Sequence, residues 1–140
     1  MNEQERLLLS AYAAGFFDGE GSVTISNKST GGRKYWDLLV RIAQQNNDVF
    51  ADLREIWGGK LYGKYDGRKN ECMNWYLRGD EAVTFLRDII PFLRCKRRQA
   101  ELGIEFRDKC YGGSLTEEIR ARRDWYKDEI SAMNAQRKVY

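Results

Sequence analysis

The sequence predicts an α+β fold with the order helix, two strands, helix, two strands, helix, followed by two further helices. Apolar residues recur at helical spacing up to residue 18, and from Ser22 to Asn27 they alternate with polar ones, which is the strand period. A second pair of strand-like segments follows an intervening helical segment, and turn-forming glycines bound both pairs. No linker or clear repeat divides the chain, so we expect residues 1–140 to form one domain.

The first helix carries two distinct stripes. Its apolar face consists of Leu9, Tyr12, Ala13 and Phe16. A second stripe consists of Ala11, Ala14 and Gly15 and ends at Asp18, and small residues at this spacing let two helix backbones approach closely. Gly19 and Gly21 are expected to end the helix. Asp18 and Glu20 then lie where the helix dipole disfavours negative charge, a cost that a divalent cation would relieve.

The later elements follow from periodicity and turn residues. We expect strands over Ser22–Asn27 and Tyr35–Ala43, joined by a loop from Asn27 to Lys34, with Val23, Ile25, Leu38, Val40 and Ile42 facing the core. A helix over Asp48–Trp57 precedes strands over Lys60–Tyr65 and Asn70–Arg78, and the faces of the last strand stay unassigned. Further helices are expected from a capping Asp80 to Pro91, from Leu93 to Lys109, and up to Ala135.

Composition excludes several classes of site. The chain has no histidine, which excludes zinc fingers of the Cys/His type, Ser-His-Asp triads and histidine-based nucleases. Its three cysteines match neither a zinc spacing nor a disulfide framework, so we interpret them as free thiols. Any catalysis must therefore depend on carboxylates, amines, amides and metals.

Charge distribution indicates a nucleic-acid partner. The net charge is only +3, but basic residues cluster within residues 60–69, 94–98 and 120–123. No apolar run reaches the roughly 20 residues that span a membrane, and the acidic N-terminus does not fit a secretory leader. We therefore expect an intracellular protein without a membrane partner. A helical interaction protein with merely solvated basic faces is a rival interpretation, which the alternation of strands and helices disfavours.

One nine-residue segment points to a known family. Residues 13–21, AAGFFDGEG, closely resemble the LAGLIDADG motif of homing endonucleases, with Ala13 in place of the usual Leu and Glu20 in place of the more usual Asp. The likeness extends to the predicted order of elements and is weakest in the final helix. It implies a LAGLIDADG endonuclease-like α-ββ-α-ββ-α core, a saddle-shaped antiparallel sheet and extra C-terminal helices. One motif per chain implies a homodimer, as in the small intron-encoded members.

The resemblance also implies an activity. Members of the family hydrolyse both strands of a long, roughly palindromic double-stranded DNA site with Mg²⁺ or another divalent cation such as Mn²⁺. The carboxylate at the eighth motif position, Glu20, would bind the metal. The stripe formed by Ala11, Ala14, Gly15 and Asp18 would lie at the dimer interface, and a structural role for Asp18 is favoured over metal binding. An RNA maturase or a cleavage-inactive DNA-binding protein of the same fold is the alternative.

Two further catalytic residues carry over by resemblance. The family often has a glutamine at the end of the second strand, and Gln44 fits this position best, with Gln45 as the fallback. It also has a lysine near the scissile phosphate within a Pro-Phe-Leu-x-x-Lys segment, which residues 91–96 match with Lys96. A plain phosphate contact or a salt bridge is the alternative for Lys96, and a polar helix-entry position is the alternative for Gln44.

Sequence readout would then fall to the strands, since antiparallel strands can follow the major groove. The candidates on the face opposite the core are Ser22, Thr24, Ser26, Lys28, Arg33, Tyr35, Asp37, Arg41, Lys60, Tyr62, Lys64 and Arg68.

Overall fold

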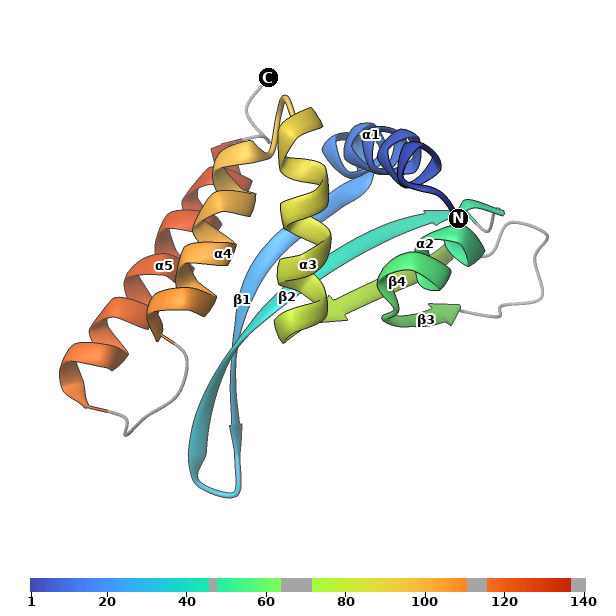
Figure 1. Cartoon of the computed structure of the whole chain (residues 1–140). Helices are drawn as coiled ribbons and strands as arrows, with labels where there is room; N and C mark the ends of the chain where they lie inside the picture. Colours follow the sequence, from blue (N-terminus) through green and yellow to red (C-terminus); the bar gives the residue numbers. More distant parts are fainter. Residues whose placement is uncertain (46–47, 64–71, 111–115, 137–140) are drawn as a thin grey trace.

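The computed structural model of the chain describes residues 1–45, 48–63, 72–110 and 116–136 (Figure 1). The elements in chain order are α1 (Glu3–Glu20), β1 (Gly21–Thr30), β2 (Arg33–Gln45), α2 (Val49–Trp57), β3 (Lys60–Gly63), β4 (Cys72–Arg78), α3 (Gly79–Ile89), the short 3₁₀ helix η1 (Ile90–Phe92), α4 (Arg97–Cys110) and α5 (Glu117–Gln136). The predicted α+β class and order of elements are confirmed. In the described part of the chain, no helix is long and apolar enough to cross a membrane.

The four strands form one antiparallel sheet in the order β1-β2-β4-β3. Helices α1, α3, α4 and α5 pack against it, and the residues that alternate towards them are buried. The predicted core positions of β1 and β2 are confirmed, since Val23, Ile25, Leu38, Val40 and Ile42 are at most 4% exposed. The alternate residues of each strand lie on the opposite face of the sheet.

The first hairpin is longer than predicted. We expected a loop over Asn27–Lys34, which is wrong, because β1 continues to Thr30 and β2 begins at Arg33. Gly31 and Gly32 have φ values of 59° and 80°, and two residues with positive φ make the tight turn whose twist suits a hairpin. The polar side chains of the segment are compatible with strands because this part of the hairpin extends beyond the core (Figure 1).

Other differences have tertiary causes. Tyr12 is 56% exposed, because the buried face of α1 is Ser10, Ala13, Ala14 and Phe17. Asp80 does not cap α3; its carboxylate forms an ion pair with Arg107 at 3.0 Å.

Several element boundaries also differ from the predictions. The helix expected from Leu93 begins at Arg97, and α1 continues through Glu20. The predicted strand end at Tyr65 and strand start at Asn70 lie outside the described residues.

Candidate functional site

The carboxylate of Asp18 links the last turn of α1 to the segment that enters α4. Its Oδ2 accepts a hydrogen bond from the backbone N–H of Arg94 at 2.8 Å, and its Oδ1 accepts from Cys95 at 3.1 Å and Lys96 at 3.0 Å. These three successive N–H groups belong to the bend that precedes α4, and such a run of backbone donors forms a binding site for an anionic group. Asp18 therefore holds the segment before α4 against the end of α1.

Lys96 makes a second connection between the same two segments, from the start of α4 back to the end of α1. Its ammonium donates to the backbone carbonyls of Phe17, at 3.1 Å, and of Gly21, and it lies 5.7 Å from the centre of the Phe17 ring. The side chain is only 6% exposed. A cation therefore occupies the carbonyl end of α1, where the helix dipole favours it. Asp18 and Lys96 together form a reciprocal clamp between the end of α1 and the start of α4.

Glu20 is exposed and lies between Asp18 and Gly21, which both form hydrogen bonds with the start of α4. It is the last residue of α1, and Gly21 caps the helix with its N–H on the carbonyl of Phe17. A Cβ added to Gly21 would overlap the ring of Phe17, which has no exposed surface, so this position admits only glycine without rearrangement. The backbone on both sides of Glu20 is thus fixed while its carboxylate faces solvent.

Gln44 lies near this end of the sheet. Gly21 pairs with Ile42, and Gln44 comes two residues further along β2, where the sheet meets the end of α1. Its Oε1 accepts a hydrogen bond from the backbone N–H of Gln45 at 2.8 Å. The fold therefore brings the predicted catalytic residues Glu20, Gln44 and Lys96 to one end of α1, with Lys96 engaged by backbone carbonyls.

One chain contributes few metal ligands at this point. In the described ranges, no group of three or more His, Cys, Asp or Glu side chains could hold a metal ion. The Glu20 carboxylate is nevertheless the hard oxygen donor that Mg²⁺ prefers, and Mg²⁺ commonly binds one or two carboxylates and completes its shell with water and phosphate oxygens. The donor chemistry of Glu20 therefore fits Mg²⁺ in a shared site.

The sheet face opposite the helices is hollow and basic. A depression of about 730 Å³ is lined by six of the predicted readout residues, which are Ser22, Thr24, Lys28, Arg41, Lys60 and Tyr62. Strand alternation places Ser26, Arg33, Tyr35 and Asp37 on the same face, further along the hairpin. Lys64 and Arg68 lie outside the described residues.

Four residues of this face were not identified from the sequence, namely Leu39, Asn74, Tyr76 and Arg78. Three of them come from β4, whose pairing with β2 places Tyr76 beside Arg41. Arg41 donates from Nε to the Oδ1 of Asn74 at 2.9 Å and lies 5.8 Å from the centre of the Tyr76 ring. Only the register of β4 against β2 could have assigned these three, whereas alternation along β2 already places Leu39 on this face.

No family model matches this chain. A curated relative, the intron-encoded DNA endonuclease ai2b of Dictyostelium discoideum, is 33% identical over 60 residues, which are 43% of this chain and 22% of that protein. The chain therefore matches only about a fifth of that relative's length.

Solved structures match along most of the chain. The homing endonuclease I-CvuI in complex with its target has a TM-score of 0.81 and 20% identity, covering 94% of this chain and 85% of its own. The archaeal intron-encoded homing endonuclease I-Vdi141I complexed with DNA has a TM-score of 0.76 and 22% identity, covering 94% and 86%. The LAGLIDADG homing endonuclease I-LtrWI bound to target DNA has a TM-score of 0.61 and 20% identity, covering 86% and 43%. This chain has the LAGLIDADG homing endonuclease fold.

The LAGLIDADG helix α1 has an exposed stripe along its outer side. Leu8, Tyr12, Gly15 and Gly19 follow one another at intervals of three or four residues, and Leu8 is 65% exposed. A Cβ added at Gly15 or Gly19 would meet nothing within 4 Å. Of the predicted interface residues, Gly15 is exposed and Ala11 is half-buried, whereas Ala14 is fully buried within the chain.

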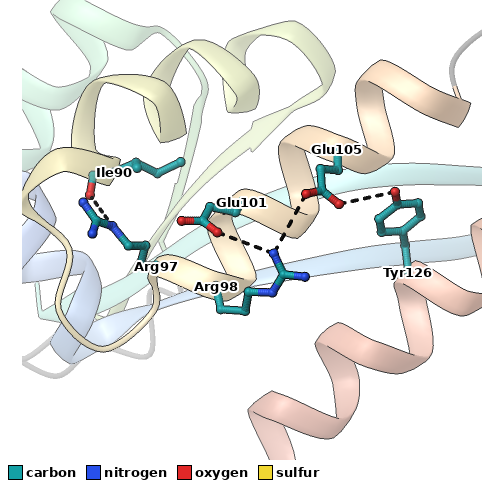
Figure 2. Close-up of polar contacts among 6 residues, drawn as sticks. All are labelled: Ile90, Arg97, Arg98, Glu101, Glu105 and Tyr126. Atoms are coloured by element: carbon teal, nitrogen blue, oxygen red, sulfur yellow. Dashed lines mark hydrogen bonds and ion pairs between the residues drawn. The ribbon is translucent and has the colours of Figure 1, made fainter.

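Within the LAGLIDADG fold, most of the basic cluster at residues 94–98 is committed to internal contacts (Figure 2). Arg98 lies 3.5 Å from a carboxylate oxygen of Glu101 and 3.9 Å from one of Glu105, which also accepts a hydrogen bond from the Tyr126 hydroxyl at 3.4 Å. Arg97 donates to the carbonyl of Ile90 at 3.3 Å. These contacts connect α4 with η1 and α5, and the basic face of the sheet is the stronger candidate for nucleic acid.

Proposed function

We propose that this protein is a site-specific double-stranded DNA endonuclease that acts as a homodimer with a divalent metal. One observation carries the proposal. An exposed carboxylate, Glu20, ends α1 two residues before Ser22, which lines the hollow sheet face together with Lys28, Arg41, Lys60 and Arg78. Basic side chains that surround a concave face suit the phosphate backbone, and strands suit the major groove. DNA on this face would pass the carboxylate.

Glu20 would hold the metal together with oxygens from outside the chain. Its single carboxylate suits an Mg²⁺ or Mn²⁺ ion whose shell is completed by the Glu20 of a second copy, phosphate oxygens and water. Such an ion activates water and neutralises charge that develops on the phosphate. Gln44 would contact the water at the metal. Lys96 would act by holding Glu20 in place through the carbonyls of Phe17 and Gly21.

The homodimer would form through the outer stripe of α1. Glycine in a helix interior costs about 1 kcal/mol relative to alanine, and Gly15 lies in an interior turn where its own chain leaves room for a Cβ. A reason outside the monomer is therefore needed, and close approach of a second α1 provides one. Leu8 and Tyr12, which are largely exposed, would be covered by the same contact, with Ala11 at its edge. Two chains would place two copies of Glu20 at the centre of a palindromic site.

The test is cleavage of a randomised duplex library. The purified protein is incubated with the library and Mg²⁺, and the cleaved ends are sequenced. Glu20→Gln is run in parallel, with Glu55→Gln as a matched control, since Glu55 is an exposed carboxylate on α2 far along the chain from the motif. Binding of the recovered site is measured separately with Ca²⁺ in place of Mg²⁺.

The expected result is a recurrent, nearly palindromic site that the unmodified protein and Glu55→Gln cut. Glu20→Gln should bind this site but not cut it. Binding without cleavage by every form would instead support the cleavage-inactive alternative, and preferential RNA binding would support a maturase. Equal cleavage by Glu20→Gln would show that another group holds the metal.

A further inference from the structure

Helix α5 packs along β1 and is attached to the first hairpin at two points. Near one end of the contact, the Asp124 carboxylate accepts a hydrogen bond from the indole N–H of Trp36 at 3.0 Å, and Trp36 is paired with Asn27 of β1. Near the other end, Asn134 donates from Nδ2 to the carbonyl of Val23 at 3.0 Å. Ten helical residues span about 15 Å, and four strand residues span about 13 Å. The helix and the strand therefore run side by side between two fixed points (Figure 1).

The outer attachment lies where the core ends. The last buried residue of β1 is Ile25 and the first of β2 is Leu38, so the hairpin between them extends beyond the core. Among the described side chains of residues 26–37, Trp36 is the one with a hydrogen bond to a helix. Its ring also lies 5.4 Å from the guanidinium of Arg123, which donates two hydrogen bonds to the Cys110 carbonyl at 3.2 and 2.7 Å.

We propose that α5 sets the path of the outer hairpin over DNA, and that Trp36 and Asp124 are positioning residues for recognition of the outer base pairs. This inference rests on the proposed function. Readout requires donor–acceptor distances of about 2.7–3.2 Å, so a hairpin that shifts by more than a few tenths of an ångström loses its contacts. Trp36 faces the helices while its neighbours Tyr35 and Asp37 face the opposite side. Holding Trp36 therefore fixes the two readout residues beside it.

The strand length predicts which base pairs are affected. A strand rises about 3.3 Å per residue, close to the 3.4 Å rise of one base pair. Ser22 and Thr24 would thus lie within about four base pairs of the centre, since Glu20 marks the centre. Lys28, eight residues after Glu20, would lie about seven or eight base pairs away. The Trp36–Asp124 hydrogen bond, which we call the brace, should therefore affect recognition from about the sixth base pair outwards.

The experiment measures discrimination at each position of the site recovered from the library. Trp36→Phe removes the indole donor and Asp124→Ala removes its acceptor. Matched controls are Trp125→Phe and Asp128→Ala, because Trp125 is 49% exposed and Asp128 is exposed one turn beyond Asp124. Single-base substitutions are introduced along the site, and cleavage of each is compared with cleavage of the intact site.

We expect both brace variants to lose about fivefold of their discrimination at the outer positions, the equivalent of one hydrogen bond. Discrimination at the four inner positions should stay unchanged, and so should the cleavage rate on the intact site at saturating protein concentration. Amide hydrogen exchange without DNA should accelerate over residues 26–29 and 35–37 but not over 38–42. Equal loss at every position, or unchanged outer discrimination, would overturn the inference. If the unmodified protein cuts no DNA, the proposed function and this role in specificity both fail, and unaltered exchange would refute the brace by itself.

Discussion

Replacing Asp18 with Asn tests whether the clamp at the end of α1 stabilises the fold. Asn has the same shape as Asp but carries no charge, and one of its two terminal atoms is a donor. The amide oxygen could still accept from Cys95 and Lys96, whose N–H groups both point at Oδ1. The amide nitrogen would then face the N–H of Arg94, which now donates to Oδ2 at 2.8 Å. The variant therefore exchanges one hydrogen bond for two donors that face each other.

The size of the effect follows from this geometry. A hydrogen bond to a charged group contributes about 1.5–3 kcal/mol. Asp18 is half-buried, and Arg94 and Cys95 are exposed, so water can hydrate part of what is lost. We therefore expect a loss of about 2 kcal/mol in the free energy of unfolding. The unfolding entropy of a 140-residue chain is about 0.3 kcal/mol per kelvin, so the midpoint of thermal unfolding should fall by about 7 °C.

Thermal and urea unfolding at one protein concentration provide the assay, because association of copies would make stability depend on concentration. Asp128→Asn is the matched control, because Asp128 is an exposed carboxylate on the surface of α5. This substitution should change the midpoint of thermal unfolding by less than 1 °C. A change in Asp18→Asn that is no larger than the control's would refute the clamp as a source of stability.

Three further outcomes are expected. Gly15→Ala should raise the stability of the monomer by about 1 kcal/mol through helix propensity yet weaken dimerisation, which sedimentation at several concentrations measures; unchanged association would place the interface elsewhere. Lys96→Met should raise the Mg²⁺ concentration needed for half-maximal cleavage while DNA binding in Ca²⁺ stays unchanged, because the carbonyls beside Glu20 lose their cation; an equal loss of binding would contradict a positioning role. Burial raises the pKa of Tyr126 and of Cys110, so the folded chain retains these protons to higher pH than the unfolded chain. The free energy of unfolding should therefore fall above about pH 9. Unfolding of Tyr126→Phe, measured over the same pH range, should show a shallower fall.

Local periodicity explains why the order of elements and much of the core could be predicted. Val23 and Ile25 alternate with polar residues, and Leu38, Val40 and Ile42 share one face of their strand although the intervening Leu39 is also apolar. All five are buried as expected. These assignments need no knowledge of what lies across the sheet, since a strand has only two faces and the apolar one must be covered.

Contacts between distant residues explain what could not be predicted. The faces of β4 depend on its register with β2, which places Tyr76 beside Arg41 and could not be read from either strand alone. Asp80 has the chemistry of a helix cap, but α3 begins one residue earlier, at Gly79, so Asp80 lies within the first turn and its carboxylate pairs with Arg107 of α4, 27 residues away. In both cases the local pattern was compatible with several outcomes, and tertiary packing selected one.

The motif itself contains two sets of residues that the sequence cannot separate. Packing within the chain explains three motif residues. Ala14 and Phe17 have no exposed surface, and a Cβ on Gly21 would overlap the ring of Phe17. Packing within the chain does not explain Gly15 and Glu20. A Cβ at Gly15 would meet nothing within 4 Å, and the Glu20 side chain faces solvent. A residue type that lowers helix stability without a reason inside the monomer points to a reason outside it. The burial of each position, and not the match to the motif, therefore distinguishes the residues that build the fold from those that we assign to a second copy, a metal and DNA.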